Sequence, residues 1–340
     1  GLVFDDGITF GVSGGIEFYG GTRATGINYG TITAITEGIG LAASDSTLLN
    51  YGSITAYGAG FYIQGIVADV VNVTAINYSQ IHTLGDEAYG IALFGQDSVV
   101  KNFGSIEIDG VFAFAIALAG SGNQGENRGT ILGTGDLDRG VILEGEGNSF
   151  INYGSIITTG EDSVGVRYSG EDLPATDGGT FTNYGRITSA GWAVRGASAD
   201  DHFINHGALI GEAAMGDGDD SYTAGKGGSL SGTLTLGDGD DLIVFEKGGG
   251  SLTVTDFVAG AGTDDVIDVS AFGYHSLSEL LSHATQSGTN VVIKFGAKDQ
   301  IVLEGVNLGS LHADDFAFAS SPLGLAVPAV HVPHGDYLFA

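Results

Sequence analysis

The residues in this chain best suited to chemistry are aspartates in two segments, 216–220 and 237–241, which both read Gly-Asp-Gly-Asp-Asp. A weaker third copy ends at Asp264-Asp265. Calcium prefers six to eight oxygen ligands from carboxylates and main-chain carbonyls. Stacked copies would gather six carboxylates in one small volume, where they repel one another unless a cation neutralises them. The predicted calcium ligands are Gly216, Asp217, Gly218, Asp219, Asp220, Gly237, Asp238, Gly239, Asp240, Asp241, Asp264 and Asp265. The alternative is a pair of solvated acidic turns.

A second group that could do chemistry consists of Arg139, Arg167 and Arg195. We expect these arginines on neighbouring turns of a repeat, near Glu144 and Asp162. Such a cluster could neutralise charge or act as a base in an enzyme that acts on polysaccharides. The alternative is a set of surface ion pairs, which contribute little to stability.

The elements that would position these residues are repeats built around Asn-Tyr-Gly-x-Ile. A Gly follows two positions after the Asn in every copy except at Ser79, and an Ile or Leu follows four positions after it. Seven spacings of 22 to 31 residues separate the copies, a period typical of solenoids. The repeated asparagines are Asn28, Asn50, Asn77, Asn102, Asn127, Asn152, Asn183 and Asn205.

Short β-rich runs separated by Gly favour extended chain over helix in each repeat. We therefore predict an all-β fold, a right-handed parallel β-helix in which each repeat forms one coil and like residues stack into columns. The Ile column fills the core, and the Gly is expected to adopt a positive φ at a tight bend. Segments 67–75, 123–127 and 171–179 interrupt the pattern and are expected to bulge as loops.

The Asn column is predicted to be structural, with each side-chain amide hydrogen-bonded to the Asn of the next coil. The residue after the Asn is aromatic in most copies, as at Tyr29, Tyr51 and Tyr153. An alternative interpretation is therefore that the Asn or Tyr columns form a glycan-binding strip, because aromatic faces suit sugars.

Composition narrows the function classes. The 340 residues contain 11 Lys plus Arg against 41 Asp plus Glu, a net charge of −30, and no Cys. So acidic a chain is not expected to bind nucleic acid or anionic lipid through its overall field, but it would attract divalent cations. No segment approaches the ~18 continuous apolar residues of a membrane span. Because the sequence opens on Gly, we expect a processed or partial chain, or export without an N-terminal signal.

The acidic segments resemble the calcium-binding nonapeptide repeat of RTX proteins, Gly-Gly-x-Gly-x-Asp-x-apolar-x. The resemblance assigns the repeat's Asp to Asp220, Asp241 and Asp264, and implies apolar positions at Tyr222, Ile243 and Val266. RTX turns recur every nine residues, whereas these recur once per coil, so we expect one column of turns along one edge.

The region after residue 254 resembles the C-terminal part of serralysin-type and other proteins exported by type I secretion. The segments that carry the resemblance are 255–257, 264–272, 303–306 and 314–318. It implies an extracellular or cell-surface bacterial protein and an uncleaved C-terminal signal. No His-Glu-x-x-His motif is present, so protease activity does not follow. A capping box at 276–279 begins the one expected helix, with Leu277, Leu280, Leu281 and Ala284 on one face.

Together these patterns predict four regions: a β-helix at 1–212, RTX-like coils at 213–270, a C-terminal cap at 271–320 and an apolar tail at 321–340. We expect a secreted calcium-binding structural protein, not an enzyme, that joins head to tail with copies of itself in a filament, surface layer or matrix. The alternatives are a calcium-dependent adhesin or glycan-binding module, and a polysaccharide lyase, epimerase or hydrolase. The residues predicted to make the joint are Leu323, Leu325, Val327, Val330 and Val332.

Overall fold

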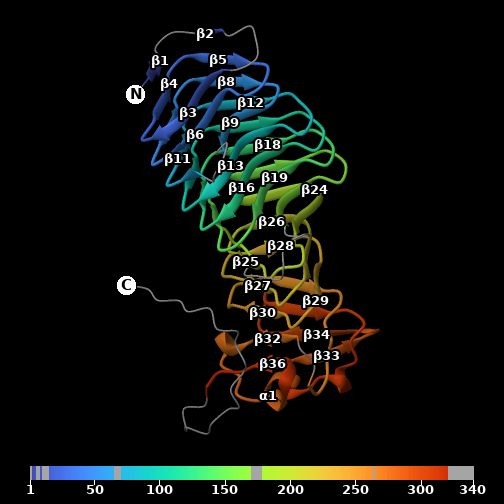
Figure 1. Cartoon of the computed structure of the whole chain (residues 1–340). Coiled ribbons are helices and arrows are strands. Elements are labelled where there is room, and N and C mark those ends of the chain that lie inside the picture. The colour runs from blue at the N-terminus through green and yellow to red at the C-terminus, as the bar shows by residue number, and fades with distance from the viewer. Residues whose placement is uncertain are drawn as a thin grey trace.

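The chain forms an all-β parallel solenoid of about nine coils. This computed structural model describes residues 2–4, 8–9, 15–64, 70–169, 178–262 and 265–320. Figure 1 shows the coils stacked along one axis, with wider coils in the blue-to-green half and narrower ones in the yellow-to-orange part. The predicted parallel β-helix architecture and its repeat basis are therefore confirmed.

One sheet consists of short strands that successive segments of the chain contribute one at a time. Its strands pair in parallel in the order of the chain. They are β1 (Leu2–Phe4), β4 (Thr25–Asn28), β7 (Thr47–Asn50), β11 (Thr74–Asn77), β14 (Val99–Asn102), β17 (Gln124–Asn127), β20 (Ser149–Asn152), β23 (Thr180–Asn183), β25 (His202–Asn205), β27 (Ser221–Ala224), β30 (Leu242–Phe245), β32 (Val266–Asp268) and β36 (Phe316–Ala317).

The second sheet begins as two rows of strands that merge at β24 (Arg186–Arg195). One row contains β2 (Ile8–Thr9), β5 (Thr31–Ala34), β8 (Ser53–Ala56), β12 (Gln80–Thr83), β15 (Ser105–Ile108), β18 (Thr130–Gly133) and β21 (Ser155–Thr158). The other contains β3 (Ile16–Thr22), β6 (Ile39–Ser44), β9 (Ala59–Gln64), β13 (Tyr89–Gln96), β16 (Phe114–Ser121), β19 (Arg139–Glu144) and β22 (Val164–Ser169), with β10 (Val70–Val71) beside β13. After β24 come β26 (Ala208–Asp217), β28 (Ser229–Leu230), β29 (Leu234–Asp238), β31 (Ser251–Val254) and β35 (Gln300–Leu303).

The repeat motif sets the register between coils. Each Asn lies opposite the next Asn, as Asn127 does opposite Asn152. The motif's Ile residues are likewise aligned, and Ile106, Ile131 and Ile156 are fully buried in the core. Burying such a side chain contributes about 1.5–3 kcal/mol before conformational entropy is counted.

The motif Gly has a different role from the one expected. None of the described motif glycines has a positive φ. A Cβ on Gly104 would instead lie 1.9 Å from the main-chain oxygen of Ser79 in the preceding coil. At Gly104 the close approach of two backbones therefore leaves no room for a Cβ, although one copy of the motif has Ser79 at this position.

Two of the expected loops contain strands. Residues 74–77 form β11 and residues 124–127 form β17, both in the first sheet. The third, 171–179, lies mostly outside the described residues. Asn123, which precedes β17, is fully buried.

The last coils close against a small cap. Helix α1 (Leu277–Leu281) begins after Ser276, whose side chain accepts a hydrogen bond from the Glu279 amide, and Leu280 is fully buried. Ala284 lies beyond the helix, in β33 (Ala284–Ser287), which pairs antiparallel with β34 (Asn290–Lys294). The 3-10 turns η1 (Ser270–Phe272), η2 (Leu308–Ser310) and η3 (Ala313–Asp315) complete the cap. Among the described residues, no helix is long and apolar enough to cross a membrane.

Candidate functional site

The repeated asparagines form a continuous ladder of hydrogen bonds. Each Nδ2 donates to the Oδ1 of the next Asn at 2.8–3.0 Å, from Asn28 through to Asn205. All eight side chains are at most 1% exposed. Because the amides are satisfied by one another and buried, this column has no group to offer a ligand.

The rings of the exposed aromatic column beside the ladder pack against one another. Tyr29, Tyr51, Tyr78 and Phe103 stack face to face with ring centroids 4.7–5.3 Å apart. Arg128 continues the stack over the Tyr153 ring at 4.3 Å. A sugar that stacks on an aromatic residue needs an open ring face, and here neighbouring side chains cover the faces along the column. This geometry does not support the proposed glycan-binding strip.

A second polar column lies at the turn just before the strands of the first sheet. We call it the turn column, and its members are Ser98, Asn123, Asn148, Asp201, Asp220, Asp241 and Asp265. The strand register places them at equivalent positions in their coils, since Val99 pairs with Gln124 and Ser221 pairs with Leu242. The sequence analysis identified Asp220, Asp241 and Asp265 as candidate ligands but missed their continuation to Ser98, Asn123, Asn148 and Asp201, because the residue type changes along the column.

Each member of the turn column accepts a backbone N–H from the coil before it. The Ser98 amide donates to Asn123 Oδ1 at 3.1 Å, and the Asn123 amide donates to Asn148 Oδ1 at 2.9 Å. In the acidic coils the Asp201 amide donates to Asp220 Oδ1 at 2.7 Å, and the Asp220 amide donates to Asp241 Oδ1 at 2.9 Å. In these coils one side-chain oxygen therefore accepts one backbone amide of the coil before it, and the column is interrupted at Gly179, which occupies the equivalent position between Asn148 and Asp201.

The second side-chain atom distinguishes the two kinds of coil. Asn148 Nδ2 donates to the carbonyl oxygens of Glu144 at 2.8 Å and of Gly120 at 3.0 Å. Asp220 and Asp241 carry an oxygen instead of this nitrogen. Both Oδ2 atoms are buried and have no hydrogen-bond partner in the part of the chain that the structure describes. A buried oxygen without a donor needs a proton or a cation.

The aspartate pKa values reflect that need. Burial raises the pKa of Asp220 to about 9, and the neighbouring carboxylates of Asp201 and Asp241 add to the rise. Burial likewise raises the pKa of Asp201 to about 8 and that of Asp241 to about 7. Backbone hydrogen bonds oppose these shifts but do not cancel them. Without a cation, the column holds protons near neutral pH.

The other predicted ligands point away from this column. Asp217, Asp219, Asp238 and Asp240 are exposed, whereas Asp220 and Asp241 are at most 2% exposed. The glycines Gly216, Gly218, Gly237 and Gly239 all have positive φ, which shapes the two turns. The six carboxylates thus form two sets, exposed and buried, and not one cluster.

The register corrects the assignment of the third turn. Leu242 pairs with Val266 and Ile243 with Ile267, so Asp265 continues the turn column and Ile267 occupies the apolar position. Asp265 Oδ1 accepts the Asp241 amide at 3.4 Å. Asp264, to which the resemblance assigned this place, lies outside the described residues. Its alignment failed because this coil is longer than the two before it.

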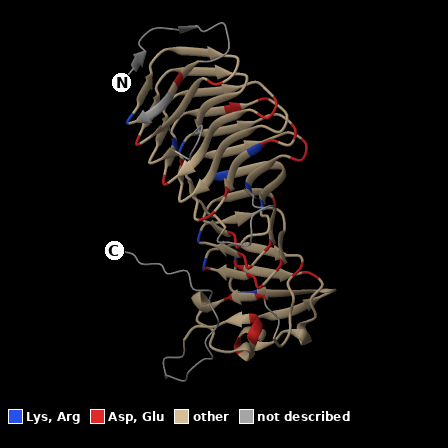
Figure 2. Ribbon diagram, in the orientation of Figure 1, with Lys and Arg blue, Asp and Glu red and all other residues tan. Residues whose placement is uncertain are grey.

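The three arginines meet in a groove on the outside of β13, β16, β19, β22 and β24. Arg167 lies directly opposite Arg195, and Arg167 also pairs in register with Ile142 on β19, the strand that carries Arg139. The groove has a volume of about 450 Å³. It is lined by Tyr89, Phe94, Phe112, Phe114, Ala117, Arg139, Ile142, Glu144, Arg167 and Arg195. Figure 2 shows basic residues on neighbouring coils of this region and acidic residues on many turns.

The structure therefore brings together Arg139, Arg167, Arg195 and Glu144, as the spacing suggested. Asp162 does not line the groove; its main-chain oxygen accepts from Arg139 Nη1 at 3.5 Å, and its charge favours the protonated form of Arg139. The aromatic lining was not anticipated, because the sequence does not reveal which residues of β13 and β16 face outward.

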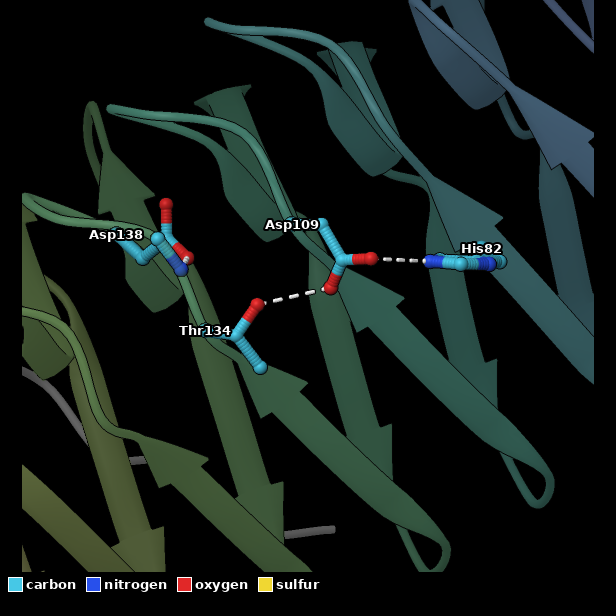
Figure 3. Close-up of polar contacts among 5 residues, drawn as sticks. His82, Asp109, Thr134 and Asp138 are labelled. Carbon is cyan, nitrogen blue, oxygen red and sulfur yellow. Dashed lines mark hydrogen bonds and ion pairs between the residues drawn. The ribbon is translucent and has the colours of Figure 1, made fainter.

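A smaller polar cluster crosses three coils near β12, β15 and β18. His82 Nε2 donates to Asp109 at 2.7 Å and Thr134 Oγ1 donates to the other oxygen at 2.8 Å, as Figure 3 shows. Burial acts to raise the pKa of Asp109, but these hydrogen bonds outweigh it and lower the pKa. With Glu107, this is the only place among the described residues where three metal-ligating side chains converge within 4.8 Å. The hydrogen bond between His82 and Asp109 is sufficient to explain why these side chains lie close together, without a bound metal.

Neither the protein-family models nor the curated proteins include a match to this chain. The case for a function therefore rests on the turn column and the groove.

Proposed function

We propose that this chain is an extracellular calcium-binding β-solenoid with a structural role. The observation that supports calcium most directly is the buried, unpartnered Oδ2 atom on both Asp220 and Asp241. At the equivalent position of the neutral coils an Asn nitrogen donates to main-chain oxygens. A cation beside the Asp oxygens would replace that donor and offset the repulsion between stacked carboxylates.

The donor set favours calcium over other metals. The turns offer carboxylate and main-chain carbonyl oxygens, with neither Cys nor His among the predicted ligands, and hard cations prefer such donors. Magnesium needs near-ideal octahedral geometry, whereas calcium accepts irregular shells of six to eight oxygens. Asp220 and Asp241 would hold the ion together with carbonyls of the turn glycines. The ion would supply charge neutralisation and a bond between coils.

An ion that binds only the folded coils stabilises them by mass action, by about 2.7 kcal/mol when its concentration is 100 times Kd. Extracellular calcium modules bind with dissociation constants of about 10⁻⁴–10⁻³ M, so the proposed ion would be present outside a cell. Secretion of a bacterial protein by a type I route agrees with this proposal and rests on the C-terminal resemblance.

Calorimetry of the full chain tests the proposal. We expect scans in chelator to show the C-terminal coils melting at lower temperature than in millimolar calcium, with magnesium substituting poorly. Hydrogen exchange in the two buffers would locate the change, and protection should be lost first at β27 and β30. Identical scans in chelator and calcium would show that the turns do not bind the ion.

Head-to-tail assembly into a filament, layer or matrix is the form of structural role that we propose. Its predicted joint, Leu323, Leu325, Val327, Val330 and Val332, lies outside the described residues and is inferred from the sequence alone. A chain without residues 321–340 should remain folded but scatter light as a monomer. If that chain associates as the full chain does, the tail is not the joint.

A further inference from the structure

The groove combines an unusual concentration of positive charge with an aromatic wall. Arg139, Arg167 and Arg195 are three of only 11 basic residues in a chain with a net charge of −30. Arg167 and Arg195 stand on adjacent strands, and such strands are about 4.8 Å apart. Neither Arg139 nor Arg195 forms an ion pair with a carboxylate of the described residues.

This cluster is held together against its own repulsion. Burial lowers the pKa of Arg139, and the like charges of Arg167 and Arg195 lower it further. The Arg139 guanidinium lies 5.3 Å from the Phe112 ring and donates to main-chain oxygens, including that of Asp138 at 3.3 Å. The negative charges of Asp138 and Asp162 oppose the lowering of its pKa but do not cancel it. An anionic group in the groove would remove the repulsion and accept several hydrogen bonds.

Most of the other residues that line the groove are aromatic or aliphatic. Tyr89 and Phe114 stack with centroids 4.9 Å apart, Phe94 meets Tyr89 edge-on at 5.9 Å, and Phe112 meets Phe114 edge-on at 5.2 Å. Phe112 is 41% exposed, so part of this wall is open to a ligand. Among the described residues that line the groove, Glu144 is the only one with a carboxylate. It can accept hydrogen bonds from hydroxyl groups.

We infer that this groove binds a glycan through a uronic acid unit, with the carboxylate at the arginines and a neutral sugar ring along the aromatic wall. Arg guanidinium groups match a carboxylate through paired hydrogen bonds. The apolar C–H face of a sugar ring can lie on an exposed aromatic side chain, and its hydroxyls can reach Glu144 and the Tyr89 hydroxyl. The cavity volume falls within the range of about 300–1,000 Å³ that is usual for small-ligand sites.

The charge distribution selects this ligand over a long polyanion. A nucleic acid or a fully charged polymer would need to pass Glu144 and a surface of strongly negative charge, which disfavours association. In a ligand with one acidic unit and one neutral unit, the acidic unit lies at the arginines, and the neutral unit carries no charge for the negative surface to repel. This inference is independent of the calcium proposal, since the groove residues are not among the calcium ligands.

The test uses two disaccharides that differ in one group, cellobiouronic acid and cellobiose. We expect isothermal titration of the full chain to detect binding of the acidic disaccharide and at least tenfold weaker binding of the neutral one. Arg195→Gln and Arg167→Gln should each weaken the acidic disaccharide about tenfold, because each removes a charge-assisted hydrogen bond. Arg167→Lys should weaken it less than Arg167→Gln does.

Arg186→Gln is the matched control, because Arg186 lies on the same strand as Arg195, is exposed and does not line the groove. It should leave affinity unchanged. Melting curves of all variants check that the coils are folded, and Phe112→Ala provides a second groove variant without a charge change. Equal binding of the two disaccharides, equal loss in the Arg186 control, or complete displacement by sulfate at the same affinity would overturn the inference. Titration in both calcium and magnesium buffers separates glycan binding in the groove from the calcium proposal, because the affinity for the disaccharide should be the same in the two buffers.

Discussion

The neutral coils around Asn123 and Asn148 and the acidic coils around Asp220 and Asp241 solve the same structural problem differently. In both, one side-chain oxygen accepts the backbone amide of the preceding coil. The neutral coils complete the turn with an amide nitrogen that donates to main-chain oxygens. The acidic coils place an unpartnered oxygen there. The first solution is independent of solution conditions, whereas the second depends on protons or cations.

Changing one side-chain atom per coil, from an amide nitrogen to a carboxylate oxygen, is therefore enough to make the stability of a coil depend on protons or cations. The neutral coils also contain a buried aspartate, Asp138, which can be compared with those of the acidic coils. Burial raises its pKa to about 6, less than in the acidic coils, and the amides of Ala113 and Gly135 and the charge of Arg139 oppose the rise. A buried carboxylate with partners for both oxygens is therefore tolerated, and the unpartnered oxygens mark the acidic coils as different.

The largest expected effect is the pH dependence of the acidic coils in chelator. The pKa values of Asp201, Asp220 and Asp241 are about 8, 9 and 7, above an unfolded value of about 3.9. The folded coils then bind more protons than the unfolded ones, so the free energy of unfolding falls as pH rises through this window. Each Asp contributes about 1.4 kcal/mol per pH unit while it is protonated only in the folded state.

Melting of the chain in chelator between pH 5 and 9 would measure this decline, which should continue to about pH 9 for the acidic coils and end near pH 6 for the neutral ones. Calcium should flatten the curve above neutral pH. A melting temperature that rises with pH would contradict the pKa directions.

The next effect comes from converting acidic coils into neutral ones. The double substitution Asp220→Asn and Asp241→Asn supplies a donor in place of each unpartnered oxygen. In chelator at pH 8 it should stabilise the C-terminal coils by about 1–3 kcal/mol per substitution, because each removes a buried oxygen that lacks a hydrogen-bond partner. It should also abolish any response to calcium. Denaturant unfolding followed by hydrogen exchange would measure both.

Asp219→Asn is the control, since Asp219 is exposed and its replacement keeps the oxygen that accepts the Asp240 amide at 3.0 Å. Its effect on stability should stay within about 0.5 kcal/mol. If the double substitution destabilises the coils in chelator, the comparison between Asn and Asp turns is wrong.

A smaller effect is expected in the Asn ladder. Asn152→Ala removes the acceptor for Asn127 Nδ2 and the donor to Asn183 Oδ1. It should cost about 1–3 kcal/mol, because buried hydrogen-bonding groups lose their partners. Urea unfolding would detect it, with Ser149→Ala on the outer side of the same strand as control. No dependence on pH or calcium should accompany the loss.

The smallest effect concerns the exposed aromatic column. Tyr51 stacks between Tyr29 and Tyr78, and Tyr51→Leu keeps an apolar side chain while removing both ring contacts. A loss of about 0.5–1.5 kcal/mol is expected. If Tyr51→Leu instead alters glycan binding and leaves stability unchanged, the column is a binding surface after all.

The sequence by itself determined the repeat, the core and the Asn ladder. These depend on which residues recur at equivalent positions, and in a stack of parallel coils equal positions must lie above one another. The 22-residue and 31-residue repeats align as well as the 25-residue ones, because insertions leave the stacked strands in place. The segment 123–127 was misread as a loop since Gln124-Gly125-Glu126 lacks the apolar residues of its neighbours.

Only the tertiary structure decided which side of a turn each carboxylate faces and what surrounds the arginines. Adjacent aspartates such as Asp219 and Asp220 are chemically identical, yet one is exposed and the other is buried. The motif Gly was likewise assigned a positive φ, when its actual constraint is a neighbouring backbone 1.9 Å from any Cβ at Gly104. Burial, close approach and the facing of outward side chains depend on the coil above and the coil below, which the local sequence does not specify.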